Sequence, residues 1–224
     1  MKLYANLTFV TRKSGLFLYL LTLVFLTTAP MKLFAVLMLF CFGCYSQPDS
    51  IAVHRARINA DFADADKSPL TQEDRARFTG LDFYPYDTKY HVTAKLTRNR
   101  HSKPFAMKTT TNRMPMYREF GTLEFEIDGK KMTLSVFQNM DLALKPGFKD
   151  YLFLPFMDMT SGKETYIGGR YLDLRIPEGT VLELDFNKAY NSYCAYYYKY
   201  SCPLVPAGND LPVEIRAGVK KFHD

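Results

Sequence analysis

The sequence predicts a mainly β fold for residues 47–224, a single antiparallel barrel or sandwich domain with one or two N-terminal helices and an apolar leader before it. Three observations predict this class. Several short segments after Gly80 alternate apolar and polar residues with a period of two. Asp128-Gly129 separates two of these segments, which is a strong signal of a β-hairpin. Many short strands at even spacing are typical of barrels and sandwiches.

The leader, residues 1–46, has the character of a signal peptide. Its charged residues are all basic: Lys2, Arg12, Lys13 and Lys32. Its apolar runs, 15–29 and 33–44, are each shorter than the roughly 20 residues that span a bilayer. The second run alone, preceded by Met31 and a lysine, has the order of a complete signal peptide, so we interpret Met31 as the true start. The alternative is a longer leader that is kept as a membrane anchor.

The leader predicts export to the periplasm or the outside of the cell. Small residues before Gln47 fit cleavage by a signal peptidase after Ser46, and the alternative is a lipid anchor on Cys44. We therefore expect contact with a membrane only through the leader or such an anchor.

The basic charge of the chain belongs largely to the leader. Residues 47–224 carry 25 of the 29 Lys and Arg and all 23 Asp and Glu, so their formal charge is 25 − 23 = +2. Nucleic-acid binding usually requires a clustered basic face on the folded domain. We therefore expect no nucleic-acid partner.

Helical signals come first in the domain. Residues 50–66 place Ile51, Ile58 and Phe62, with His54, on one helical stripe. Thr71 followed by Asp74 is typical of the capped start of a short second helix.

The strand signals follow. The predicted strands are 92–97, 123–127, 132–136, 151–156, 166–176 (interrupted by Gly168-Gly169), 180–186 and 213–217. The tyrosine-rich run 193–200 is interpreted as a further strand whose rings pack across a sheet. The alternative is that these rings, with Lys199, stack on sugars or bind an aromatic ligand.

Specific motifs resemble a known family. They include Ser68-Pro-Leu-Thr-Gln-Glu-Asp-Arg, Phe78-Thr-Gly-Leu-Asp-Phe-Tyr-Pro, Met107-Lys-Thr-Thr-Thr-Asn-Arg, Gly168-Gly-Arg-Tyr-Leu, Asp185-Phe-Asn and Cys202-Pro. In these motifs residues 50–222 resemble the bacterial domain of unknown function family 1684. The resemblance implies one domain and supplies no established activity, substrate or catalytic residue.

Polar residues concentrate among aromatic ones between 158 and 191. An arginine fork beside asparagine amides and tyrosine hydroxyls can receive a small polar or anionic ligand or a glycan. The predicted ligand-binding residues are Arg170, Asp185, Asn187, Asn191, Tyr166 and Tyr190. In strand alternation, Arg170 and Leu172 face away from Tyr171 and Asp173.

Two alternatives to ligand binding stay open. In the first, the domain is a carboxylate-dependent hydrolase in which Glu164 and Asp185 act as acid and base. In the second, the domain is structural or serves interactions, and a buried Arg170–Asp185 pair holds the C-terminal strands together.

The cysteines and histidines predict no metal site. Cys194 and Cys202 are disulfide candidates, because export permits a disulfide and no histidine lies near them in sequence. The four histidines are scattered, and no phosphate-binding loop or dinucleotide fingerprint occurs. We therefore expect neither a metal nor a cofactor.

Overall fold

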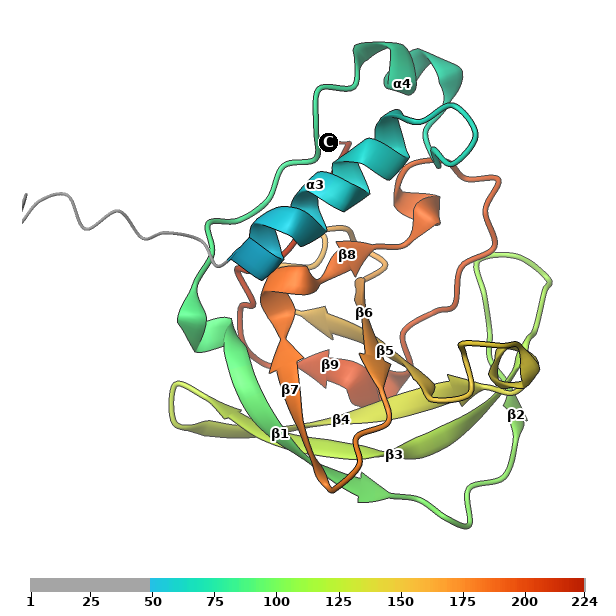
Figure 1. The fold of residues 1–224 in the computed structure, drawn as a ribbon, viewed down its shortest axis with the longest axis vertical. Coiled ribbons are helices and arrows are strands. Elements are labelled where there is room, and N and C mark those ends of the chain that lie inside the picture. Colours follow the sequence, from blue (N-terminus) through green and yellow to red (C-terminus); the bar gives the residue numbers. More distant parts are fainter. Residues whose placement is uncertain (1–48, 224) are drawn as a thin grey trace, which may run out of the picture. The chain divides into compact units, whose positions relative to one another are not determined.

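The computed structural model describes residues 49–223, and in them nine strands form one sheet (Figure 1). The strands are β1 (His91–Arg98), β2 (Phe105–Ala106), β3 (Met116–Ile127), β4 (Lys130–Asn139), β5 (Tyr151–Asp158), β6 (Arg170–Arg175), β7 (Val181–Asp185), β8 (Tyr190–Asn191) and β9 (Asp210–Leu211). They pair in the order β7-β1-β3-β4-β5-β6-β8, with β2 on β3 and β9 on β5.

The prediction of a mainly β fold is confirmed, whereas closure into a barrel or sandwich is not. The sheet is open, because its end strands β7 and β8 do not pair with each other within residues 49–223. Neighbouring strands are antiparallel except β9, which runs parallel to β5. Leu184 of β7 and Leu172 of β6 nevertheless share one core, so the two halves of the sheet curve around the same apolar interior.

The predicted hairpin is present between β3 and β4. Ile127 pairs with Lys130, and the two residues between them have positive φ angles, 50° for Asp128 and 75° for Gly129. Positive φ at both central residues defines the turn type that matches the twist of the flanking strands. This local chemistry explains why the hairpin could be predicted from sequence.

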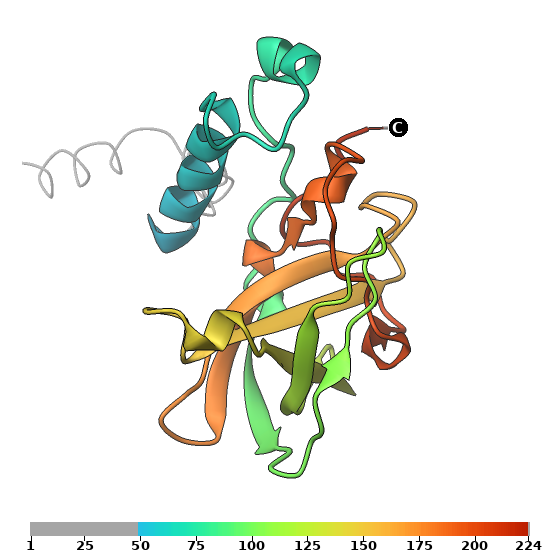
Figure 2. The same cartoon turned by 90° about the vertical axis from the view of Figure 1, so that its right-hand side faces the viewer.

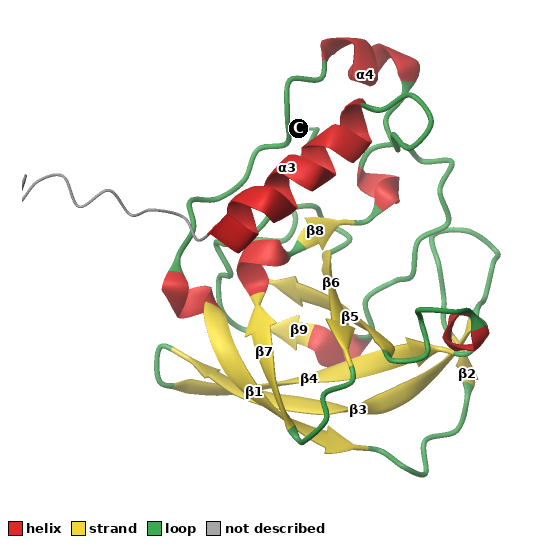
Figure 3. Cartoon of the chain, in the orientation of Figure 1, coloured by secondary structure: helices red, strands yellow, loops and turns green. Residues whose placement is uncertain are grey.

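Two helices precede the sheet, as predicted. Helix α3 spans Asp49–Ala63 and helix α4 spans Gln72–Arg77. The backbone N–H of Asp74 donates to Thr71 Oγ1 at 3.0 Å, which confirms the predicted cap of α4. Figures 2 and 3 show both helices gathered at one end of the domain, beyond the strands. Five short 3-10 turns complete the described elements: η1 (Thr88–Tyr90), η2 (Leu142–Leu144), η3 (Phe186–Lys188), η4 (Tyr193–Ala195) and η5 (Ala207–Asn209).

Strand β5 is covered on both faces, which explains its nearly continuous apolar sequence. Leu152, Leu154 and Phe156 point into the main core, while Phe153 belongs to a second cluster of aromatic rings on the other face. A cleft lined by Phe153 opens on this second face.

Three of the predicted strands differ from the structure. The segment 166–176 is a strand only from Arg170, because Gly169 at φ +81° turns the chain immediately before it. The segment 213–217 is not a strand, since the carbonyls of Ile215 and Ala217 accept hydrogen bonds from the side chain of Arg170 instead of from a neighbouring strand. The run 193–200 contains η4 and turns, in which the N–H groups of Tyr196 and Tyr197 bond back to Tyr193.

The predictions for the leader, residues 1–46 with Met31 and Cys44, lie outside the described residues. In the part of the chain that the structure describes, no helix is both long and apolar enough to cross a membrane.

Candidate functional site

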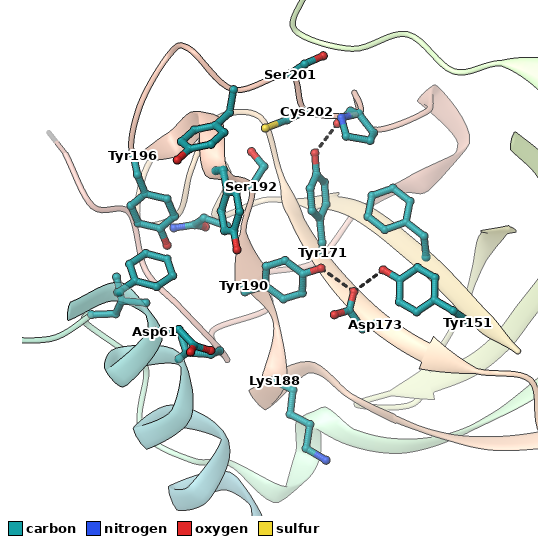
Figure 4. Close-up of a pocket in the computed structure, with 18 of the residues that line it drawn as sticks. Asp61, Tyr151, Tyr171, Asp173, Lys188, Tyr190, Ser192, Tyr196, Ser201 and Cys202 are labelled. Atoms are coloured by element: carbon teal, nitrogen blue, oxygen red, sulfur yellow. Dashed lines mark hydrogen bonds between the residues drawn. The ribbon is translucent and has the colours of Figure 1, made fainter. Parts of the chain in front are cut away.

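A cleft of about 570 Å³ opens between α3, the β5–β6 face of the sheet and the loop that follows β8 (Figure 4). We call it the tyrosine cleft, because seven tyrosines line it: Tyr117, Tyr151, Tyr171, Tyr190, Tyr193, Tyr196 and Tyr200. Its volume lies within the range of roughly 300–1,000 Å³ that is usual for small-molecule sites.

Helix α3 supplies one wall through a single face. The residues that line the cleft are His54, Arg57, Ile58, Asp61 and Phe62. Their spacing of three and four places them one above another on an α-helix. Phe62 anchors this wall, because it packs edge-on against Tyr196 with ring centroids 4.8 Å apart. The same face therefore carries both the apolar contacts of the helix and its polar groups at the cleft.

The sheet supplies the floor through strand alternation. Tyr171 and Asp173 of β6 point to the cleft, while Arg170 and Leu172 point into the interior, as the predicted alternation requires. Phe153 of β5 pairs with Asp173 in the register, and Tyr190 of β8 pairs with Tyr171 on the other side. Three adjacent strands thus bring aromatic rings to both sides of one carboxylate.

Asp173 is the polar centre of the floor. The hydroxyls of Tyr151 and Tyr190 both donate to its Oδ1, at 2.7 and 2.6 Å, and Figure 4 shows the carboxylate between the two rings. Hydrogen bonds of this length to an ionised acceptor are strong and hold the carboxylate in place. Its other oxygen, Oδ2, accepts no hydrogen bond from residues 49–223, and the side chain is exposed to solvent. One acceptor atom is therefore fixed in position and open to a ligand.

The tyrosines of the floor hold their protons more tightly than free tyrosine. Burial, followed by the negative charge of Asp173, raises the pKa of Tyr151 and that of Tyr190. Burial also raises the pKa of Tyr171, whose hydroxyl donates to the carbonyl of Pro203. All three are hydrogen-bond donors at neutral pH.

We expect these tyrosines to resist ionisation. Their pKa in the unfolded chain is near 10, and it is raised in the folded protein. Their contribution to stability is therefore complete below pH 10 and is lost as the pH rises through the folded values. An alkaline titration should show, by phenolate absorbance, exposed tyrosines ionising first and these three only with unfolding. Titration of all the tyrosines near pH 10 in a folded protein would contradict this expectation.

The loop after β8 supplies the third wall. The sulfur atoms of Cys194 and Cys202 lie at disulfide-bonding distance, 2.18 Å. The short loop between them carries Tyr196 and Tyr200 to the cleft. Thr110 anchors the loop from outside, since its N–H donates to the carbonyl of Cys202 and its hydroxyl accepts from the N–H of Cys202. The predicted cysteine pair therefore lies in the wall of the site.

Two buried polar atoms in this wall have no hydrogen-bond partner in the described residues. They are Oδ1 of Asn191 and the hydroxyl of Tyr196, and both residues line the cleft. Burial raises the pKa of Tyr196, and the neighbouring Asn191 amide offsets part of this rise. Unsatisfied buried polar groups are uncommon in native proteins, and a ligand or water is a usual reason for them.

More basic than acidic side chains line the cleft. Arg57, Arg113 and Lys188 line the cleft, against the acidic Asp61 and Asp173. Burial and the nearby charge of Arg57 lower the pKa of His54, so His54 is neutral at pH 7. The residues that line the cleft therefore have a formal charge of +3 − 2 = +1.

Comparison with known proteins assigns the chain to a family. The family described as "Protein of unknown function (DUF1684)" matches residues 76–220, which is well over half of the chain. The chain belongs to this family. A similar fold is seen in the solution NMR structure of an uncharacterized protein from Haloarcula marismortui, with 32% sequence identity and a TM-score of 0.61. That similarity covers 76% of this chain and 92% of the other. No functionally curated protein matches.

Arg170, in the Gly-Gly-Arg motif that resembles DUF1684, lies away from the tyrosine cleft. Its side chain is 0% exposed, and its guanidinium donates to Asp158 Oδ2 and to the carbonyl of Ile215, each at 2.7 Å, and to the carbonyl of Ala217. Asp158 is its charge partner rather than Asp185. The guanidinium thus ties the C-terminal segment to the β5–β6 hairpin and is out of reach of a ligand in the cleft.

Asp185 and Asn187, from another DUF1684 motif, bond to each other. The backbone N–H and the side-chain amide of Asn187 both donate to Asp185 Oδ1 at 3.0 Å. The side chain of Asn187 also bonds to the backbone of Asp87. Its amide N–H donates to the carbonyl of Asp87 at 3.0 Å, and its Oδ1 accepts from the N–H of Asp87 at 3.1 Å. This pair joins the segment before η1 to the end of β7 and does not line the cleft.

The proposed acid–base pair of the hydrolase hypothesis is not brought together. Glu164 forms a two-pronged ion pair with Arg216, with contacts of 2.8 to 3.1 Å, and accepts from the hydroxyl of Tyr84 at 3.0 Å. These hydrogen bonds, led by that from Arg216, lower the pKa of Glu164. Asp185 belongs to the separate network of Asn187.

Of the six predicted ligand-binding residues, Tyr190 and Asn191 line the tyrosine cleft. Tyr166 packs with the helix-side apolar cluster instead. Sequence reasoning placed Asp173 in the polar cluster between 158 and 191 but did not select it as a ligand-binding residue, and it missed Tyr151 and the polar face of α3. A signal for them was present, because residues 54, 57, 58, 61 and 62 follow helical spacing and Asp173 alternates with Arg170. In the described residues, no cluster of three or more metal-ligating side chains occurs.

Proposed function

We propose that this domain binds a small hydroxyl-rich ligand, a sugar or short glycan, in the tyrosine cleft. One observation carries the proposal: Asp173 presents an open carboxylate oxygen from a floor in which two tyrosine hydroxyls fix its other oxygen. A sugar hydroxyl can donate a hydrogen bond to such an acceptor, so the ligand does not need to carry a charge. Aromatic walls give the apolar face of a sugar ring a surface to pack against.

The remaining groups fit the same ligand class. The amide oxygen of Asn191 and the hydroxyl of Tyr196 are buried without a partner in the described residues, so each would gain a hydrogen bond from a bound hydroxyl. The basic residues that line the cleft would tolerate an acidic substituent on the ligand. A small cation is disfavoured, because three basic side chains line the same cleft as Asp173.

We propose further that the domain works outside the cytoplasm. The basic, apolar leader and the two cysteines at bonding distance in the cleft wall support this location.

Saturation-transfer NMR tests sugar binding directly. The probes are glucose, galactose, N-acetylglucosamine and their disaccharides, added to the wild type, to Asp173→Asn and to the matched control Asp210→Asn, which alters an exposed aspartate of β9. We expect at least one probe to bind the wild type and the control, and to bind Asp173→Asn roughly 10- to 100-fold more weakly, since a hydrogen bond to a charged group is worth about 1.5–3 kcal/mol. Equal binding to all three proteins, or binding of no probe, would contradict the proposal.

A further inference from the structure

Arg113 brings to the tyrosine cleft a guanidinium group that has no charge partner. It lines the cleft, and its side chain forms no ion pair with residues 49–223. The other two basic residues of the cleft differ from it. Lys188 lies 3.7 Å from Asp185 Oδ2, and Arg57 is an exposed residue of α3 whose guanidinium no hydrogen bond within the described residues fixes. Arg113 is therefore the cation of the cleft that most needs explaining.

The guanidinium of Arg113 is held in one orientation by Ser201. Its Nε donates to Ser201 Oγ at 3.1 Å, and its Nη2 donates to the carbonyl of Ser201 at 2.8 Å. Ser201 is fixed in turn, because its hydroxyl donates to Thr109 Oγ1 at 3.0 Å and lies 2.6 Å from Thr111 Oγ1. These bonds leave Nη1 of Arg113 without a partner in residues 49–223, although an arginine has five N–H groups to donate. The result is a preorganised donor with unused N–H groups.

Contacts between aromatic rings connect Arg113 to the floor of the cleft. Burial raises the pKa of Tyr117, and a hydrogen bond with Asn139 and the positive charge of Arg113 offset part of this rise. The ring of Tyr117 packs against that of Phe153, with centroids 5.9 Å apart. Phe153 pairs with Asp173 in the register of β5 and β6. Two aromatic rings therefore lead from the guanidinium to the open carboxylate.

We propose that the ligand of the tyrosine cleft is an acidic sugar whose single carboxylate binds Arg113 while one of its hydroxyls donates to Asp173. The inference rests on the proposed sugar binding and adds the charge of the ligand. A guanidinium offers parallel N–H groups that match the two oxygens of a carboxylate. The formal charge of +1 on the residues that line the cleft also suits a ligand with one negative charge. A phosphate ester, with nearly two negative charges, fits less well beside Asp61 and Asp173.

Matched sugars that differ only in charge test the proposal. The probes are glucose with glucuronic acid and glucose 6-phosphate, and galactose with galacturonic acid, titrated by NMR at pH 7 into the full chain. We expect the acidic member of at least one pair to bind about 10-fold more tightly than its neutral counterpart, which is the low end for a charge-assisted hydrogen bond because Arg113 is exposed to solvent.

A pair of variants assigns this preference to Arg113. In Arg113→Gln the acidic sugar should bind only as tightly as the neutral one, and the affinity for the neutral sugar should not change. The control Arg100→Gln removes the same charge from an exposed residue outside the cleft and should keep the preference.

The outcomes separate this inference from sugar binding itself. Equal affinity of the wild type for acidic and neutral sugars, or tighter binding of the phosphate ester than of the carboxylate, would overturn the inference and leave sugar binding intact. Loss of the neutral sugar in Arg113→Gln would also overturn it, because Arg113 would then act only by holding the loop at Ser201. Binding of none of these sugars by the wild type would overturn both proposals.

Discussion

Replacing Asp158 by alanine is expected to lower the free energy of unfolding by about 3–5 kcal/mol. The ion pair between Asp158 and Arg170 has both side chains 0% exposed, so the substitution leaves a buried guanidinium without its counter-charge. Asp158 also accepts from the N–H and hydroxyl of Thr160, at 2.8 and 2.6 Å, and from the N–H of Ile215 at 3.2 Å. Removing one carboxylate therefore loosens both the β5–β6 turn and the C-terminal segment.

Urea denaturation of Asp158→Ala and of the exposed-site control Asp210→Ala measures this effect. The control should change the free energy of unfolding by no more than about 0.5 kcal/mol. The double variant Asp158→Leu with Arg170→Met should recover part of the loss, because it removes both buried charges. If Asp158→Ala were as mild as the control, the ion pair would not hold the C-terminal segment.

Replacing Cys194 by serine is expected to cost about 2–3 kcal/mol under oxidising conditions. A disulfide between Cys194 and Cys202 closes a loop with a sequence separation of 8, and opening it restores freedom mainly to the unfolded chain. The substitution would also release the loop that carries Tyr196 and Tyr200 into the cleft wall.

Thermal unfolding with and without reductant separates this cause from simple loss of packing. The variant should melt below the wild type in oxidant, and reductant should bring the wild type down to the level of the variant. An equal difference between the two proteins in reductant would count against a disulfide.

Local elements of this fold could be predicted because their causes are local. The Asp128-Gly129 turn and the Thr71 cap each depend on a few consecutive residues, and both are present. The alternation that separates Tyr171 and Asp173 from Arg170 was visible for the same reason. Alternation along a strand predicts which side chains share a face, but it does not predict which residues pack against that face.

The site could not be predicted because its parts meet through long-range pairing. Tyr151, Asp173 and Tyr190 are joined only by the register of β5, β6 and β8. The sequence suggests Asp185 as the partner of Arg170, yet Asp158 is its partner because β5 and β6 form a hairpin. An open sheet and a closed one also share the same alternation along each strand, so closure was not encoded in that pattern.

The most direct measurement is an NMR titration of the protein labelled with ¹³C in its tyrosine rings, using a sugar that binds in the probe panel. We predict that the ring signals of Tyr151, Tyr171 and Tyr190 shift as the sugar is added, while that of Tyr198, which is 87% exposed and outside the cleft, stays in place. Shifts at Tyr198 with none at the three cleft tyrosines would contradict binding in the tyrosine cleft.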